Sequence, residues 1–193
     1  KMATGDGFLA KQEYEPAGIH ILLALVLPPY QIFTRGKIEG VKSFEGVKLY
    51  STGGAKDLTV GALGGVPIRM ATSELYESLS RGTIDGGLMA YGTALAYKVP
   101  EFVHYATKGE NFGSGVVTYG ISTANWNKLP ENVRKALDDA GAEATQSACK
   151  AVDAGVDADI ASLGKAGVTL VAMPQSDREK IGSEMARIAE EWA

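Results

Sequence analysis

The chain has 193 residues, 45% of them hydrophobic, which is enough for one large domain or two small lobes. Its formal net charge of -4 argues against the basic surface that nucleic-acid partners require. Cys149 is the only cysteine, so the sequence excludes an internal disulfide and a cysteine-ligated metal cluster. The longest apolar run, residues 19–27, is shorter than the roughly 20 residues of a membrane-spanning helix.

The first part of the chain predicts strands joined by short helices. Residues 8–14 are typical of a helix end, and residues 19–27 predict a strand that is buried on both faces of a parallel sheet. Gly53 and Gly54 precede a probable helix through Leu58 and Ala62. Further strands are expected over residues 30–34, 47–51, 103–106 and 116–122.

The segment 64–87 predicts a strand, a capped helix and a second strand in close succession. Thr72 and Ser73 are two candidate N-caps, and Leu75 and Leu79 share one face of the helix. Gly82 follows as a left-handed stop, after which residues 83–85 resume an extended pattern. A helix enclosed between two strands indicates an α/β layer.

The C-terminal third predicts a long helix that opens after Pro130 and ends near Gly167. Its apolar positions recur every three or four residues, as expected for one buried stripe. They are Val133, Leu137, Ala140, Ala144, Ala148, Val152, Val156, Ile160 and Leu163. A short strand is expected over residues 168–172.

A capping box of Ser176 and Glu179 predicts the start of a last helix. The apolar side chains expected to face inward from it are Ile181, Met185, Ile188 and Trp192.

The sequence offers no clear catalytic machinery. His20 and His104 both lie between apolar strand residues, which favours buried structural histidines over a nucleophile–base pair. No glycine-rich phosphate loop is present. We therefore predict a protein that is not an enzyme, with no catalytic residue, no metal site and no cofactor. An enzyme hidden on this scaffold would show turnover that is lost in His104→Ala.

The pattern E-x-Y-x-x-L-x-x-G-x-x-D-G, from Glu74 to Gly86, resembles the DctP-type solute-binding proteins of TRAP (tripartite ATP-independent periplasmic) transporters. Three further stretches resemble landmarks of that family in the same order. They are residues 44–49, similar to its "DLKGLKIR" strand, residues 99–102, and the entry to the long helix at residues 125–130. The resemblance covers nearly the whole chain.

The resemblance implies an α/β fold with the two-lobe architecture of type II periplasmic binding proteins and a long connecting helix. Here we expect only the C-terminal two-thirds of that architecture, without the N-terminal part of one lobe. Residues 1–40 would end lobe I and cross the hinge, and residues 41–100 would form the α/β core of lobe II. Residues 101–128 would return through the hinge, and residues 129–193 would hold the long helix, a short strand and the C-terminal helix.

The function that the resemblance implies is that of a periplasmic receptor. It would capture a small organic solute between two lobes and deliver it to the integral membrane subunits of a TRAP transporter. A receptor that serves a sensor is an alternative. The alanine-rich stripe of the long helix leaves open a monomer or a helix-mediated dimer, and no nucleic-acid partner is expected.

Three departures from the family pattern bear on the solute. Tyr50 stands where a typical member has a carboxylate-binding arginine, Tyr30 stands at the position of a second arginine, and Met89 stands at that of an asparagine. Two tyrosines and a methionine offer ring faces, hydroxyls and an apolar filler in place of bidentate anion partners. We therefore expect a solute that is less acidic, or more aromatic or apolar, than the usual dicarboxylates.

Other pocket candidates follow from rough register with the family. They are Thr72, Tyr91, Asn111 and Phe112. Arg69 and Arg81 stay open as relocated anion partners, although Arg81 suits the C-terminal end of its helix. If either arginine enters the pocket, the protein would be an ordinary organic-acid receptor.

Overall fold

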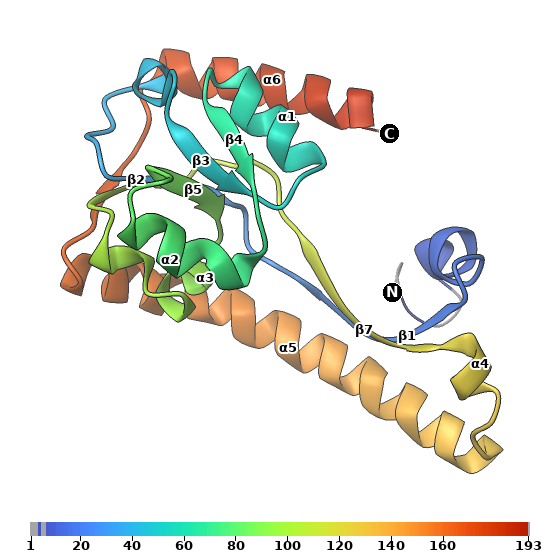
Figure 1. Cartoon of the computed structure of the whole chain (residues 1–193). Helices are drawn as coiled ribbons and strands as arrows, with labels where there is room; N and C mark the ends of the chain where they lie inside the picture. Colours follow the sequence, from blue (N-terminus) through green and yellow to red (C-terminus); the bar gives the residue numbers. More distant parts are fainter. Residues whose placement is uncertain (1–3, 5–6, 193) are drawn as a thin grey trace. The chain divides into compact units, whose positions relative to one another are not determined.

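The computed structural model describes residue 4 and residues 7–192, whose contacts form two compact units (Figure 1). The ribbon unit comprises the described residues up to Leu27 together with Gly115–Gly155. The sheet unit comprises Pro28–Ser114 together with the described residues from Val156 onward. Helix α5 (Glu131–Lys165) contributes to both units. The division into four segments at residues 40, 100 and 128 concerns the lobes of a receptor and stays a prediction.

The sheet unit is built on a six-stranded mixed sheet in the order β4-β3-β5-β2-β6-β8. Strand β3 runs parallel to β4 and β5, β6 runs parallel to β8, and β2 is antiparallel to both of its neighbours. The strands are β2 (Gln31–Thr34), β3 (Lys48–Ser51), β4 (Val66–Arg69), β5 (Gly86–Met89), β6 (Tyr105–Thr107) and β8 (Thr169–Val171).

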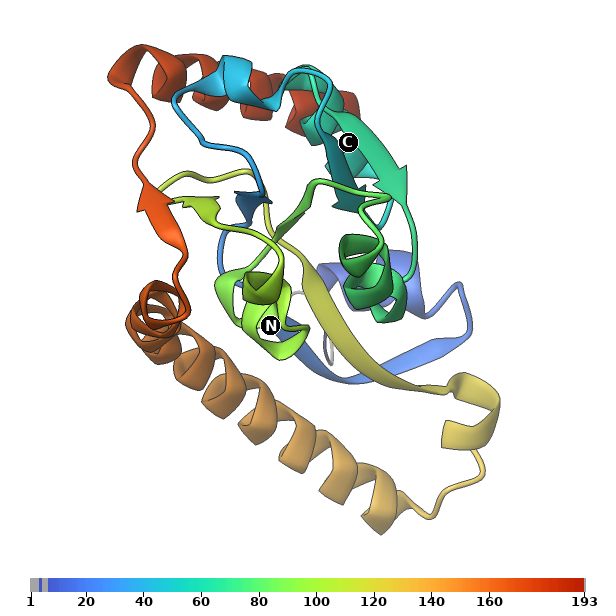
Figure 2. The ribbon, with the colours of Figure 1, turned by 60° about the vertical axis from the view of Figure 1, so that its left-hand side comes forward.

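Helices cover both faces of this sheet, which confirms the predicted α/β layering (Figures 1 and 2). Helices α1 (Ala55–Ala62) and α6 (Gln175–Trp192) pack together on one face. Helices α2 (Leu75–Ser80) and α3 (Tyr91–Ala96) cover the other, with the C-terminal part of α5. The core on that side includes Phe33, Tyr50, Leu75, Leu79, Ile84, Met89, Ala94, Val103, Ala106 and Leu163. Helical turns η2 (Val41–Phe44), η3 (Thr72–Glu74) and η4 (Val99–Glu101) connect the layers.

The residues of the family pattern hold the strands together. Gly82 follows α2 with a φ of 69°, as the predicted left-handed stop requires. The Asp85 carboxylate accepts a hydrogen bond from the Lys48 backbone N–H at 3.0 Å. At Gly86 a β-carbon would overlap the carbonyl oxygen of Phe33, so only glycine permits this strand spacing. Strand β5 begins at Gly86 rather than at residue 83, because the preceding residues form the turn.

The helix starts differ from the predicted caps. Neither Thr72 nor Ser73 caps α2, because η3 precedes it and the Glu74 carboxylate accepts the Ala71 N–H at 2.9 Å. Helix α6 begins at Gln175, whose side-chain amide donates to the Glu179 carboxylate at 3.0 Å. The predicted Ser176–Glu179 box is therefore replaced by a glutamine–glutamate pair.

The ribbon unit contains a two-stranded antiparallel sheet of β1 (Ile19–Val26) and β7 (Val116–Ser122). Turn η1 (Ala10–Tyr14) precedes this sheet, and α4 (Thr123–Trp126) follows it. The prediction that the first strand belongs to a parallel sheet and is buried on both faces is wrong. Among the described residues, strand β1 pairs only with the antiparallel β7, and only Ile21 and Ala24 along it are buried.

Helix α5 confirms the predicted long helix, which begins directly after Pro130. Within the ribbon unit, α5 lies against β1 through small side chains. A β-carbon at Gly141 would overlap the carbonyl oxygen of Leu22, and the Ala24 N–H donates to the Thr145 hydroxyl at 3.2 Å. Gly141 and Thr145 each follow a residue of the predicted stripe, and it is their small size that lets the helix approach the strand backbone closely.

The two histidines have different surroundings. His20 stacks on Trp126 with ring centroids 3.8 Å apart, and its Nε2 lies 2.8 Å from an Asp138 carboxylate oxygen. His104 is exposed, so the prediction of a buried side chain is wrong there. Its backbone pairs with strands on both sides, which explains the apolar neighbours.

Candidate functional site

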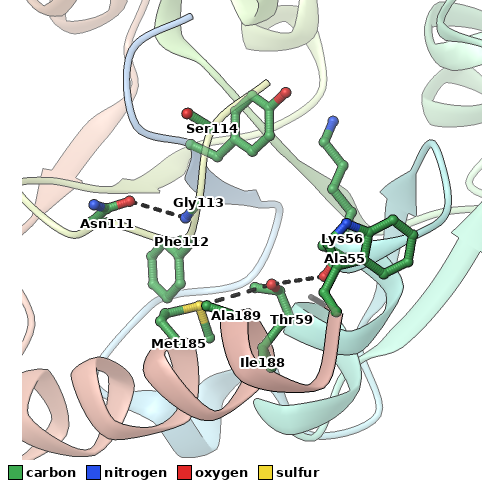
Figure 3. Close-up of a pocket in the computed structure, with 12 residues that line it drawn as sticks. Ala55, Lys56, Thr59, Asn111, Phe112, Gly113, Ser114, Met185, Ile188 and Ala189 are labelled. Carbon is green, nitrogen blue, oxygen red and sulfur yellow. Dashed lines mark hydrogen bonds between the residues drawn. The ribbon is translucent and has the colours of Figure 1, made fainter. Parts of the chain in front are cut away.

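A cavity of about 360 Å³ lies within the sheet unit, beside α1 and α6 (Figure 3). Four segments form its wall: the residue before β2, the first turns of α1, the residues after β6, and the C-terminal half of α6. The side chains that decide its chemistry are Tyr30, Lys56, Asn111, Phe112, Met185 and Trp192.

Two glycines directly precede helix α1, whose first turns line this cavity. Gly53 and Gly54 have φ angles of 92° and 61°, which let the chain turn sharply from β3 into the helix. A β-carbon at Gly54 would lie 3.1 Å from the Trp192 ring. The turn therefore brings α6 close to α1 and places Lys56 in the first turn of the helix.

Lys56 is the charged group of the cavity. Its ammonium lies 4.2 Å from the centroid of the Tyr30 ring and 5.4 Å from that of Tyr50, within the range of cation–π attraction. Burial lowers the pKa of Lys56 to about 8, because the ammonium has lost much of its water. Burial raises the pKa of both Tyr30 and Tyr50, so the two rings stay neutral at pH 7.

The rest of the wall is mostly apolar, and its polar groups are largely engaged. The Thr59 hydroxyl donates to the Ala55 carbonyl at 3.0 Å and lies 3.8 Å from the Met185 sulfur. The Asn111 side-chain oxygen accepts the Gly113 N–H at 3.0 Å, as Figure 3 shows. Phe112 is 1% exposed. An occupant of this cavity would therefore meet one cation, a few neutral polar groups such as the Tyr30 and Ser114 hydroxyls, and mainly apolar surface.

Tyr50 and Thr72 form a pair behind the cavity. The Tyr50 ring is buried in the core, and its hydroxyl lies 2.7 Å from the Thr72 hydroxyl. This hydrogen bond joins the end of β3 to η3 and fixes the orientation of the ring. The centroid of the Tyr50 ring lies 5.4 Å from the Lys56 ammonium, which links Tyr50 to the residues that line the cavity.

Arg69 is engaged by a carboxylate. Its guanidinium donates to Asp57 through Nη2 at 2.6 Å and Nε at 3.2 Å, and the Ser51 hydroxyl donates to the same carboxylate at 2.6 Å. Burial alone would raise the pKa of Asp57, but the hydrogen bonds from Ser51 and Arg69 and the charge of Arg69 lower it. The arginine lines neither cavity of the sheet unit described here.

Tyr91 lies at a second cavity of about 340 Å³ in the sheet unit, which shares Asn111 with the first. The Tyr91 hydroxyl donates to the Thr107 carbonyl at 2.9 Å. Burial, together with the charge of Glu110, raises the pKa of Tyr91 to about 12. The Gln31 amide donates to the Glu110 carbonyl at 2.6 Å, so the floor of this cavity is a buried polar network.

The predicted pocket residues therefore do not all lie in one cavity. Tyr30, Asn111 and Phe112 line one cavity, and Tyr50 touches its lysine from behind. Met89 is 1% exposed in the core. Sequence reasoning missed Lys56, whose only signal is its place just after two glycines at a helix start. It also assigned Met185 and Trp192 to an inward face, which is wrong for Trp192 because that residue is 63% exposed; both side chains line the cavity.

Metal-binding and membrane-spanning features were searched over the described residues only. In residue 4 and residues 7–192, no group of three or more His, Cys, Asp or Glu side chains is placed to hold a metal ion. Within the same part of the chain, no helix combines the length and apolar character needed to cross a membrane.

The mixed sheet, the long helix and the helices on both faces of the sheet define an α/β protein, and its sheet unit contains a cavity of small-molecule size. Residues 9–193 match the family model of DctP, the bacterial extracellular solute-binding proteins of family 7. The chain therefore belongs to this family, and the resemblance expected from its motifs is confirmed.

Individual relatives match either part of this chain in sequence or most of it in fold. The C4-dicarboxylate-binding periplasmic protein DctP of Rhodobacter capsulatus is 34% identical over 91 residues, which are 46% of this chain and 26% of that protein. The crystal structure of DctP7, a Bordetella pertussis extracytoplasmic solute receptor binding pyroglutamic acid, has a TM-score of 0.87 and 22% identity, covering 96% of this chain and 61% of that one.

A further similar structure is a TRAP periplasmic solute-binding protein from Bordetella bronchiseptica with bound mandelate. Its TM-score is 0.81 at 23% identity, covering 91% of this chain and 56% of that one. This chain therefore spans little more than half the length of these solved structures and about a quarter of the curated relative.

Proposed function

We propose that this chain is the solute-binding part of a periplasmic receptor that captures a small organic solute and delivers it to the membrane subunits of a TRAP transporter. Membership of the family supports the class of function. The observation that carries the proposal is the cavity of the sheet unit, which combines a single lysine with aromatic walls. Its volume suits a small ligand.

The solute that this site favours is less acidic, or more aromatic or apolar, than a dicarboxylate. Tyr30, Asn111 and Phe112 are the proposed direct contacts, with Tyr50 and Thr72 supporting the wall from behind. Tyr91 would act at the second cavity, and Met89 would fix the packing of β5 beneath the site. Apolar walls stabilise a ring or branched chain by removing it from water.

Two solved relatives bind acids of this general kind. The Bordetella pertussis receptor binds pyroglutamic acid, and the Bordetella bronchiseptica protein has bound mandelate. Each of these compounds has one carboxylate on a cyclic body. Other solved structures of the same fold have bound L-malate or malonate, which carry two carboxylates, so the preference for one carboxylate rests on the cavity of this chain alone.

A second candidate is an ordinary organic-acid receptor with a relocated arginine. The similarity to the C4-dicarboxylate-binding protein of Rhodobacter capsulatus favours it. Arg69 would then have to leave Asp57, which holds it through two hydrogen bonds. A receptor for a sensor would use the same site, and a TRAP membrane subunit captured with the protein would distinguish transport from sensing.

The test is native mass spectrometry of the purified chain, followed by calorimetric titration with monocarboxylates, dicarboxylates and neutral aromatic compounds. We expect an excess native mass, lost on denaturation, from an aromatic or apolar solute. Tight binding of succinate that is abolished in Arg69→Ala would support the second candidate instead. Light scattering of the same sample distinguishes a monomer from a helix-mediated dimer.

A further inference from the structure

We infer that Lys56 is the group that recognises the charge of the solute, and that the cavity selects one carboxylate carried on an aromatic or branched apolar body. This inference rests on the proposed function as a solute receptor. It adds a specificity-determining residue that has no counterpart among the candidates drawn from the family pattern.

The charges of the cavity point to Lys56. Among the described residues that line it, Lys56 carries the only charged side chain. In the described part of the chain no carboxylate forms an ion pair with it, whereas Arg69 is paired with Asp57 and Arg178 lies 3.3 Å from Glu110. The lysine is therefore the cation of this site that is available to an anionic ligand.

The surroundings of Lys56 hold it in place for that task. The rings of Tyr30 and Tyr50 flank its ammonium at 4.2 and 5.4 Å, and the Tyr50–Thr72 hydrogen bond fixes one of these rings. Figure 3 shows the Lys56 side chain extending from α1, with its ammonium end pointing away from Met185 and Ile188 of α6. A carboxylate at the ammonium would replace part of the hydration that burial has removed.

The apolar wall limits the number of charges to one. Phe112, Met185 and Ile188 offer carbon and sulfur surface, and none of these three side chains can donate a hydrogen bond to a second carboxylate. A ring or branched chain instead gains from the same surface. The cavity thus favours a monocarboxylate over a dicarboxylate, because its lining offers a single cation, Lys56.

The protonation of Lys56 adds a pH dependence. Its pKa of about 8, lowered by burial, means that the lysine loses its charge in mildly alkaline solution. The titratable groups that face it are Tyr30 and Tyr50, both with raised pKa values, and its neighbour on α1 is Asp57, held by Ser51 and Arg69. The residues of α6 that line the cavity carry no charge. Anion affinity should therefore fall as the pH rises above about 8, because the free lysine loses its charge there while a bound carboxylate favours the protonated form.

The experiment is calorimetric titration of the 193-residue chain with phenylacetate, its neutral analogue phenylacetamide, and succinate. We expect phenylacetate to bind at least tenfold more tightly than either of the others at pH 7. In Lys56→Met, phenylacetate affinity should fall at least tenfold while phenylacetamide affinity changes less than threefold. Lys56→Arg should retain part of the phenylacetate affinity, because it keeps the charge.

Lys180→Met is the matched control, since Lys180 is an exposed lysine of α6 outside the cavity and should leave all affinities unchanged. Circular dichroism of each variant verifies that it is folded. If phenylacetate binds equally to wild type and Lys56→Met, or if succinate binds more tightly than phenylacetate, the inference is overturned while the receptor function stands. If wild type binds none of the three ligands and carries no co-purified solute, the proposed function fails as well.

Discussion

The ribbon unit and the sheet unit differ in how far their large apolar side chains are exposed to solvent. In the sheet unit, two helical layers enclose the strands, and Leu79 and Leu88 have no exposed surface. In the ribbon unit, Tyr119 is 70% exposed, and Val116 and Val117 are each 51% exposed. The sheet unit therefore derives its stability from an enclosed core, whereas the ribbon unit depends on close backbone contacts between β1 and α5.

This contrast also explains where a ligand site can form. A cavity keeps its shape when the side chains around it are fixed by a packed core on the other side. Tyr50 meets that condition, because it belongs to the core of the sheet unit and still presents its ring to Lys56. The ribbon sheet, with many side chains open to water, offers no comparable support among its described residues.

The strongest perturbation of the sheet unit is expected from Gly86→Ala. The new β-carbon would overlap the Phe33 carbonyl, so β5 and β2 would have to separate, at a cost of about 3–5 kcal/mol in the free energy of unfolding. Urea denaturation measures this. Gly61→Ala in α1 is the control, because its β-carbon meets nothing within 4 Å and should stabilise by about 0.5–1 kcal/mol. Equal effects of the two changes would contradict the packing described for β5.

Truncation of a core side chain tests the contrast between the units directly. We expect Leu79→Ala to lower the free energy of unfolding by about 2–5 kcal/mol, because it leaves a cavity under the sheet. Tyr119→Ala, a larger truncation at an exposed site, should change it by less than about 1 kcal/mol. Thermal unfolding of both variants provides the comparison. If Tyr119→Ala lowers the free energy of unfolding as much as Leu79→Ala does, the Tyr119 side chain must be buried in solution.

Gly141→Ala should weaken the ribbon unit alone. The added methyl group would press on the Leu22 carbonyl and push α5 away from β1, costing about 1–3 kcal/mol. Hydrogen exchange should then accelerate in β1 and β7, with the strands of the sheet unit unchanged. Gly155→Ala on the same helix, where a β-carbon meets nothing within 4 Å, is the control. Faster exchange throughout the chain would show that the two units unfold together.

The smallest expected change in the free energy of unfolding comes from the charge of Lys56. Its pKa is about 8 in the folded chain and about 10.5 when unfolded, so the unfolded state binds more protons between these values. Stability from this group is therefore lowest below pH 8 and rises toward pH 10.5. Lys56→Met should be about 1–2 kcal/mol more stable than wild type at pH 7, after allowance for partial exposure of the lysine.

Chemical denaturation of wild type and Lys56→Met at pH 7 and pH 9.5 tests this dependence. The difference between the two proteins should shrink at the higher pH, and other titrating groups cancel because both proteins contain them. A difference that is independent of pH would mean that burial does not lower the pKa of Lys56. A less stable variant would mean that the contacts with Tyr30 and Tyr50 outweigh the desolvation of the charge.

The sequence by itself determined the elements whose signals are local. The stripe after Pro130 predicted α5, Gly82 predicted the end of α2, and residues 116–122 predicted β7. The pattern from Glu74 to Gly86 also led to the correct family. These features depend on residues close together in the chain, whose spacing is fixed by backbone geometry.

Only the tertiary structure decided the partners of those elements. An apolar run such as residues 19–27 fits either a buried parallel strand or one side of a ribbon, and the pairing of β1 with β7 spans about half of the chain. Lys56 looks like an ordinary helix-surface lysine in the sequence. Its proposed role depends on the fold, which brings Tyr30, Phe112 and helix α6 together at the cavity that Lys56 lines. Burial and charge at a site are sums over residues far apart in the chain, so local spacing could not predict them.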